Sequence, residues 1–474
     1  MTHPLDLPAL RLAAKIREGG VSAEAVVTES LRRARAIQAK LNPFVLLRDE
    51  KALEAARAAD RERAALPLLG VPFAAKDLTP TKGDLTTLGS WTEGDHVADH
   101  TALCIQRLEE AGAILIGKTT TPEFAYSSFT QSPRWGVTRN PWNPERTSGG
   151  SSGGSGVAVA AGVVPFAEGT DMGGSVRIPS ALCGVVGLKP SLGRIPMTIL
   201  PSLFDNISHF GPLARRVEDA IAFMAAAAGP SDQDIQSLPL SFSVARARRG
   251  TLAGRHFAFS LDLGYYAVQP EVEQVIRAAI ARFREAGAIV EEVELGWSRL
   301  VNDQWHDLWC VFMASFFGGR VKNYGERMDP RMVSMIAKGQ KMGAAAYKQV
   351  EFLRTRMWRD LADLFVRYDA LLCPTCAKEA PLATENDADH DATLENGRYD
   401  GLDMTLPFNM VPQCPVLTLP VGLTANRLPV GLQIVGHRFA DEDVLAFARQ
   451  AERLMPPLLS PTAKLISEEG GRVV

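Results

Sequence analysis

Two glycine-rich loops, each containing a serine, hold the residues whose types and spacing best suit chemistry. Ser151 lies in Gly149-Gly-Ser-Ser-Gly153, and Ser175 ends a second loop at residues 169–175. Between them, residues 157–164 are almost wholly apolar and must be buried, which argues against a flexible linker. Consecutive glycines before Ser175 allow several backbone N–H groups to converge on one point, as an oxyanion hole requires. The two loops therefore predict a serine-based acyl-transfer site.

A serine hydroxyl is a good nucleophile only when a base removes its proton, and Lys76 is the candidate base. It lies near the end of residues 67–78, a short apolar segment bounded by proline and glycine that predicts a buried strand. Position alone allows two interpretations. Lys76 either reaches water from the end of a strand, or is buried with a lowered pKa that leaves it neutral.

The loop around Ser151 also fits G-x-S-x-G, the nucleophile elbow of α/β-hydrolases, so an esterase with a Ser-His-Asp triad is an alternative. Five histidines follow Ser151 in the chain, so their order does not exclude it. The elbow leaves the second glycine loop unexplained, however, and none of these histidines has a context typical of a catalytic base. The sequence therefore favours a lysine over a histidine as the base.

The elements that must position these residues alternate between helix and strand. The sequence Glu-Ala-Gly-Ala-Ile occurs at residues 110–114 and again at 285–289, each time between a helical pattern and an apolar segment. Such punctuation is typical of an α/β architecture with at least partly parallel strands. The patterns predict helices at residues 7–18, 23–40, 50–65 and 101–110, and strands at 67–78, 113–116, 257–263, 370–374, 416–420 and 432–435.

Composition argues against several classes of partner. The chain has 474 residues, 46% of them hydrophobic, and a net charge of −3, so a large core is available and nucleic acid or an acidic membrane is not an expected partner. No apolar run reaches the roughly 18 residues of a membrane span, and the N-terminus does not resemble a signal peptide. Six scattered cysteines predict neither a disulfide framework nor a metal site. We expect a cytoplasmic protein without a metal or cofactor.

Several interlocking motifs resemble the amidase signature family. The matching segments are residues 149–155 and 169–179 with their glycines and serines, Cys183-Gly-Val-Val-Gly-Leu-Lys-Pro190, Ala75-Lys-Asp77 and the tail at residues 415–436. The resemblance implies a single α/β/α domain over residues 1–474, with a large mixed central sheet covered by helices. Within it we expect N-terminal helices (1–65), a signature core with the catalytic residues (66–228), a helical part that forms the substrate pocket (229–400), and a C-terminal return to the sheet (401–474).

The resemblance also implies roles for individual residues. Ser175 takes the place of the nucleophile, Ser151 that of the bridging serine after a cis peptide bond, and Lys76 that of the general base. This Ser-Ser-Lys triad would hydrolyse an amide through an acyl-enzyme, and the activity should rise into the alkaline range because the lysine must be neutral. The family's oxyanion hole falls on the N–H groups of Met172, Gly173, Gly174 and Ser175, and its supporting positions fall on Ser152, Thr170, Asp171 and Arg177.

The substrate is less defined than the chemistry. Residues 122–136 depart from the pattern of the glutamine-hydrolysing component of the tRNA-dependent amidotransferase, whereas Arg139-Asn-Pro-Trp-Asn143 is similar to stand-alone and nylon-oligomer hydrolases. Residues 305–347 are rich in Trp, Phe and Met, which predicts either helical core or the lining of an apolar pocket. We therefore expect a monomeric or homodimeric hydrolase of apolar or aromatic amides or of carbamates (urethanes), with the amidotransferase component as the alternative. The expected pocket residues are Tyr126, Phe129, Trp135, Leu200, Phe204 and Phe316.

Overall fold

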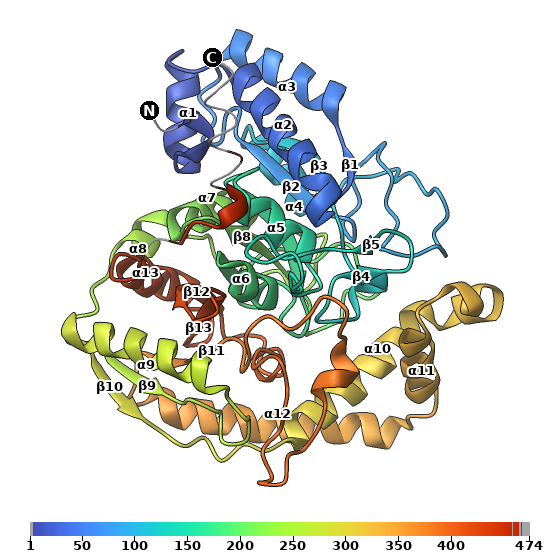
Figure 1. Ribbon diagram of the computed structural model, residues 1–474, viewed down its shortest axis with the longest axis vertical. Coiled ribbons are helices and arrows are strands. Elements are labelled where there is room, and N and C mark those ends of the chain that lie inside the picture. Colours follow the sequence, from blue (N-terminus) through green and yellow to red (C-terminus); the bar gives the residue numbers. More distant parts are fainter. Residues whose placement is uncertain (1–2, 457, 464–465, 467–474) are drawn as a thin grey trace.

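A mixed sheet runs through the whole molecule (Figure 1). The structure is a computed structural model that describes residues 3–456, 458–463 and 466. In this part of the chain the sheet has 11 strands, in the order β1-β3-β2-β6-β8-β7-β12-β13-β11-β9-β10. The strands are β1 (Phe44–Leu47), β2 (Pro72–Lys76), β3 (Ile114–Thr119), β6 (Phe166–Asp171), β7 (Val186–Lys189), β8 (His209–Ala214), β9 (His256–Phe259), β10 (Ile289–Glu292), β11 (Ala370–Pro374), β12 (Val416–Leu423) and β13 (Pro429–Gly436); β4 (Gln131–Ser132) and β5 (Gly136–Val137) form a separate short ribbon.

The sheet is parallel in two regions and antiparallel between them. β3, β2 and β6 are mutually parallel, as are β11, β9 and β10, whereas the central strands from β6 to β11 pair antiparallel. The expected α/β class, with one large mixed sheet covered by helices, is confirmed. Because β2 and β6 are parallel neighbours, with Phe73 opposite Phe166, their carboxyl ends meet at the same edge of the sheet. Lys76 ends one strand and Asp171 ends the other.

Helices cover both faces of the sheet. α5 packs on β2, β3 and β6, while α7 packs on β7 and β8. In Figure 1 the helices α1–α3 lie at one end of the long axis and α12 at the other. The helices are α1 (Ala9–Arg17), α2 (Ala23–Leu41), α3 (Asp49–Glu62), α4 (Leu103–Glu110), α5 (Gly153–Ala160), α6 (Arg177–Cys183), α7 (Val217–Ala227), α8 (Val244–Arg248), α9 (Pro270–Glu285), α10 (Leu300–Tyr324), α11 (Pro330–Gln340), α12 (Ala344–Phe365) and α13 (Asp441–Glu452). Within the described residues, no helix is long and apolar enough to cross a bilayer.

The predicted elements of the signature region need two adjustments. The buried apolar segment at residues 157–164 is helical only as far as Ala160, and its helix, α5, begins earlier, at Gly153. The small residues of the first turn allow close approach, since a Cβ at Gly154 would meet the Pro43 carbonyl and Thr120. The second glycine loop is also shorter than expected, since residues 169–171 belong to β6. Their backbone pairs with β8, from Gly169 opposite Gly211 to Asp171 opposite His209, so a sequence that resembles a loop is held as a strand.

The apolar interior has two main parts. The larger surrounds the sheet, and the second packs α10–α12 against the loops near Met172 and Tyr126. The Trp/Phe/Met-rich segment is divided between the core and a cavity wall, and its role in binding a substrate stays a prediction. Met313 and Met332 are fully buried core residues, whereas Trp305 and Met335 face a cavity.

Candidate active site

Lys76 and Ser151 are in direct contact inside the protein. Lys76 Nζ donates to Ser151 Oγ at 2.6 Å and to Thr170 Oγ1 at 2.9 Å, and both Lys76 and Ser151 are 0% exposed. The parallel pairing of β2 with β6 brings Lys76 and Thr170 together at one edge of the sheet. The Gly150–Ser151 peptide is cis, as expected, and Ser151 lies just before α5 begins. Of the two interpretations of Lys76, the structure supports the buried one.

Burial controls the charge of Lys76. The loss of water around its amine lowers the pKa of Lys76 to about 7, although the negative charges of Glu168 and Asp171 oppose the shift. Glu168 contacts the backbone of this lysine: its Oε2 accepts the Lys76 backbone N–H at 2.8 Å, and its Oε1 accepts Thr79 Oγ1–H at 2.9 Å. Burial raises the pKa of Glu168. A neutral amine can accept a proton from Ser151, so the site has the elements of a base and a relay.

Ser175 lies on the loop between β6 and α6. Its carbonyl accepts the Ser152 N–H at 3.1 Å, which joins the two serine loops to each other. Ser152 Oγ lies 3.4 Å from both the N and the O of Thr170, so the residues expected to support the loops do contact them. Among the described residues no hydrogen bond to the Ser175 hydroxyl is recorded. Ser175 is partly exposed and faces a cavity of about 50 Å³.

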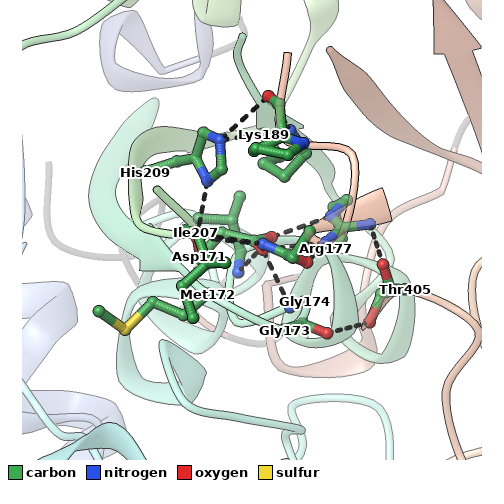
Figure 2. Close-up of polar contacts among 12 residues, drawn as sticks. Asp171, Met172, Gly173, Gly174, Arg177, Lys189, Ile207, His209 and Thr405 are labelled. Carbon is green, nitrogen blue, oxygen red and sulfur yellow. Dashed lines mark hydrogen bonds and ion pairs between the residues drawn. The ribbon is translucent and has the colours of Figure 1, made fainter. Parts of the chain in front are cut away.

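Asp171 and Arg177, at the two ends of this loop, form a buried ion pair (Figure 2). Arg177 donates to both carboxylate oxygens of Asp171, each at 2.9 Å, and both side chains are 0% exposed. Burial alone would raise the pKa of Asp171, but the Arg177 guanidinium holds it well below its usual range. The remaining Arg177 donors bind Thr405 O, Gln433 Oε1 and Asn409 Oδ1, so the guanidinium ties the loop to the C-terminal part of the chain.

The Asp171 carboxylate also takes up two backbone N–H groups of the loop. Gly174 N–H donates to Oδ1 at 2.9 Å, and Val176 N–H donates to Oδ2 at 3.3 Å. The Gly174 N–H, one of the four expected oxyanion donors, is therefore engaged within the protein. The described residues offer no recorded acceptor to the N–H groups of Met172, Gly173 and Ser175, which line the 50 Å³ cavity. These three are the donors available to a substrate oxygen.

Two cavities with shared walls lead to Ser175. The inner one, of about 50 Å³, is bounded mainly by apolar side chains, among them Met172, Ile178, Trp305, Trp309 and Leu406. The outer one, of about 680 Å³, lies within the usual range of small-molecule sites. Its walls are not wholly apolar, as they include charged or titratable side chains: Arg299, Asp303, His306, Asp307, Arg331, Lys338, Asp387, Asp391 and Asp403.

Of the six expected pocket residues, the structure brings only Tyr126 to these two cavities. Phe129 is 0% exposed and stacks on His390, while Phe204 points outward at 76% exposure. Trp135 donates to Thr87 Oγ1 at 2.8 Å instead of facing a cavity. Leu200 packs at the edge of the second apolar cluster, and Phe316 packs on Phe312. Whether a residue on a loop or on a long helix lines a cavity depends on the direction of its side chain, which cannot be predicted from composition alone.

Other residues of the site had no prominent sequence signal. Glu168 could have been noticed as an acid inside an otherwise apolar segment. His209 is buried with Nδ1 3.1 Å from Asp171 O, and burial, followed by the nearby Lys189 charge, lowers the pKa of His209 to about 3 (Figure 2). Thr405 contacts the Gly173 carbonyl across 232 residues of sequence. The recorded side-chain partner of Ser151 Oγ is Lys76 rather than a histidine, unlike the nucleophile elbow.

The sheet, the two serine loops and the buried lysine suit an enzyme of the α/β class that transfers acyl groups through a serine. The chain matches the family described as "Amidase" over residues 25–445, and it belongs to this family, the amidase signature family. It is therefore a hydrolase that acts on amide bonds.

The chain is similar to members of this family that are named for different activities. The chain is 35% identical to an acylamidase of Rhodococcus erythropolis over 463 residues, covering 95% of this chain and 96% of that protein. It is 33% identical to a component of the glutamyl-tRNA(Gln) amidotransferase of Lachnospira eligens over 470 residues, covering 93% and 96%. The crystal structure of a bacterial aryl acylamidase superposes with a TM-score of 0.89 at 29% identity, covering 97% of this chain and 98% of that one.

Proposed function

We propose that this protein is a stand-alone acylamidase that cleaves apolar or aromatic amides, or carbamates, with Ser175 as nucleophile, Ser151 as proton relay and Lys76 as general base. The observation that carries the proposal is the buried contact of 2.6 Å between Lys76 Nζ and Ser151 Oγ. A contact this short between a buried amine and a serine hydroxyl is what a relay through Ser151 requires, because the neutral amine must take the hydroxyl proton.

The reaction follows from these positions. Lys76, neutral above its pKa, takes the proton of Ser151 as Ser151 takes that of Ser175. Ser175 Oγ then attacks the amide carbon, and the carbonyl oxygen gains negative charge next to the available N–H groups of Met172, Gly173 and Ser175. The proton returns through Ser151 to the departing amine, which leaves an acyl-enzyme. Water, activated by the same relay, releases the acid and restores Ser175.

The cavities support the substrate class. Trp305, Trp309 and Leu406 line both cavities, so an amide substituent that lies between Ser175 and the outer cavity would meet apolar and aromatic walls. The other substituent would extend into the outer cavity, whose charged walls suit a more polar group. The six cysteines are buried free thiols, which supports a reducing compartment such as the cytoplasm. We propose a monomer or homodimer that acts without a second kind of chain.

One panel of assays tests the proposal. The purified chain should hydrolyse anilides, fatty amides or aryl carbamates by itself, and Ser175→Ala should abolish that activity. The second candidate is the amidotransferase component, favoured by the 33% identity to such proteins. Glutamine should then be the preferred substrate, with ammonia released only when the other components are added. Activity on anilides that survives Ser175→Ala would contradict the proposed nucleophile.

A further inference from the structure

Every carbonyl of the loop from Met172 to Ser175 is held by a hydrogen-bond donor. Met172 O accepts Trp305 Nε1–H at 3.2 Å, and Gly173 O accepts Thr405 Oγ1–H at 2.6 Å. Gly174 O accepts the Ile178 N–H at 2.7 Å, and Ser175 O accepts the Ser152 N–H at 3.1 Å. The loop is therefore fixed by its oxygens, while the active-site function proposed for it depends on its N–H groups.

The directions of the N–H groups follow from those of the oxygens. In a trans peptide, the C=O of one residue and the N–H of the next point to opposite sides. The N–H of Gly174 points away from Thr405 and donates to the Asp171 carboxylate. Two residues further along the chain, the N–H of Val176 donates to the same carboxylate. The alternate N–H groups, those of Gly173 and Ser175, have no recorded acceptor among the described residues. Gly173 and Ser175 line the inner cavity, whereas Gly174 does not.

Two of the four donors come from outside the glycine-rich stretch. Trp305 lies in α10, and Thr405 lies immediately before the short 3-10 helix at residues 406–408. Both also explain why the loop contains two glycines. A Cβ at Gly173 would overlap the Trp305 ring, and a Cβ at Gly174, where φ is +133°, would overlap the Thr405 hydroxyl. The glycines provide the space in which the two side chains reach the backbone oxygens.

We propose that Trp305 and Thr405 are positioning residues of the oxyanion hole. By holding Met172 O, Trp305 keeps the Gly173 N–H directed at the substrate oxygen. By holding Gly173 O, Thr405 keeps the Gly174 N–H on Asp171 and so fixes the backbone between the Gly173 and Ser175 N–H groups. This inference rests on the proposed function and deepens it. Trp305 also lines both cavities, so one side chain would both contact the substrate and orient the loop.

Asp403 and Gly173 O both lie within hydrogen-bond distance of the Thr405 hydroxyl. Thr405 Oγ1 lies 2.6 Å from Gly173 O and also 2.6 Å from Asp403 Oδ1, but a hydroxyl has a single proton to donate. Burial raises the pKa of Asp403. In its protonated form, Asp403 donates to Thr405 Oγ1 and leaves the threonine proton for Gly173 O.

The test compares variants that remove one donor each. Trp305→Phe removes the indole N–H and keeps most of the ring, Thr405→Val removes the hydroxyl, and Thr405→Ser restores it. Two controls remove the same kind of bond elsewhere: Trp91→Phe, since Trp91 Nε1 donates to Pro133 O at 2.9 Å, and Thr462→Val, since Thr462 Oγ1 donates to Pro141 O at 2.8 Å. Thermal unfolding of every variant establishes that it is folded.

Two measurements distinguish a residue that positions the oxyanion loop from one that only shapes the pocket. The first is the division between kcat and KM on an anilide. The second is the rate at which diisopropyl fluorophosphate labels the enzyme, followed by intact mass, because its P=O oxygen occupies the oxyanion hole without the natural substrate. Removing a direct oxyanion donor typically costs about 10²–10³ in kcat, so an indirect one should cost about tenfold or more. We expect both kcat and the labelling rate to fall by that factor in Trp305→Phe and Thr405→Val, with KM nearly unchanged and with recovery in Thr405→Ser.

The outcomes are distinct. A wild-type enzyme that is labelled at Ser175, with both variants labelled equally fast, overturns the positioning proposal and leaves the proposed function intact. A loss confined to KM also overturns it, because it shows a wall of the pocket rather than an orienting bond. A wild-type enzyme that is never labelled at Ser175 overturns the proposed nucleophile and this inference with it. If Thr405→Val does not fold, Trp305→Phe decides alone.

Discussion

The amine of Lys76 donates to the hydroxyl of Ser151 at 2.6 Å although neither side chain reaches water. An isolated ammonium would be costly at such a position, and burial accordingly favours the neutral amine. Thr170 Oγ1, at 2.9 Å, orients the amine toward the serine. The same burial that makes this lysine expensive to charge makes it suitable as a base.

Removing the base should nearly abolish turnover. We expect Lys76→Ala to lower kcat on an anilide by about 10²–10⁴, the usual contribution of a positioned acid–base group, with little change in KM. The matched control is Lys118→Met, in the neighbouring strand β3. Lys118 is also 0% exposed, but its recorded contacts are Thr86 Oγ1 at 3.1 Å and Asp77 at 4.0 Å. Full activity in Lys76→Ala would remove Lys76 from the mechanism.

The pH profile should show the protonation of Lys76 directly. Burial lowers the pKa of Lys76 to about 7, and only the neutral amine can accept a proton. Log kcat/KM should therefore rise with pH through the neutral range and level off on the alkaline side, with a slope near one on the acid limb. Stopped assays in constant-ionic-strength buffers measure it. A profile that is flat from about pH 5 to about pH 9 would exclude a lysine base with this pKa.

Much of this site could be predicted because its residues lie in recognisable local patterns. Glycines before a serine and a lysine at the end of an apolar segment are local signals, and the structure brings Lys76, Ser151 and the Ser175 loop to one edge of the sheet. The pattern of helix, glycine and strand likewise predicted the parallel regions. Strand β6 was not predicted, because Gly169, Thr170 and Asp171 resemble a loop and only pairing with β8 holds them extended.

The pocket could not be predicted in the same way. Phe204 and Phe129 are equally aromatic, yet one is 76% exposed and the other fully buried, because loop direction and packing decide which side chains meet a cavity. Trp305 and Trp309 are one helical turn apart and both line the inner cavity, but only Trp305 reaches the Met172 carbonyl. Such contacts depend on how α10 packs against a loop that is distant in the sequence.

Breaking the ion pair behind the loop should cost stability. Arg177→Met leaves Asp171 charged and unpaired in the interior, which typically costs about 3–5 kcal/mol in the free energy of unfolding. Urea unfolding measures the change. The matched control is Arg194→Met, since Arg194 and Asp441 form a similarly buried pair at 3.0 Å. Both variants should lose stability, but only Arg177→Met should also slow kcat, because Arg177 contacts the residue that binds the Gly174 N–H. Equal kcat in the two variants would contradict this expectation.

His209 provides a test against a histidine mechanism. Burial, followed by the charge of Lys189, lowers the pKa of His209 to about 3, so its imidazole is neutral throughout the range in which the enzyme should work. We therefore expect His209→Gln to leave the midpoint of the acid limb unchanged, even if it lowers the thermal midpoint. A displaced or absent limb in this variant would assign the titration to the histidine and revive the Ser-His-Asp alternative.

Glu168 should set where the acid limb lies. Its carboxylate stabilises the charged form of Lys76 and so raises the lysine pKa, against the larger effect of burial. Glu168→Gln keeps an oxygen to accept the Lys76 backbone N–H but removes the negative charge, so the pKa of Lys76 should fall and the acid limb should move to lower pH. Glu123→Gln, which neutralises another carboxyl that is 0% exposed, is the control and should leave the limb in place.

The direction of that shift is decisive because the loss of a nearby negative charge makes any titrating group easier to deprotonate. A limb that moves to higher pH in Glu168→Gln would therefore contradict an electrostatic role for this carboxylate. An unchanged limb, with Lys76→Ala inactive, would show instead that Glu168 is protonated in the native protein. Burial, unopposed by Glu168, would then determine the pH at which Lys76 becomes a base.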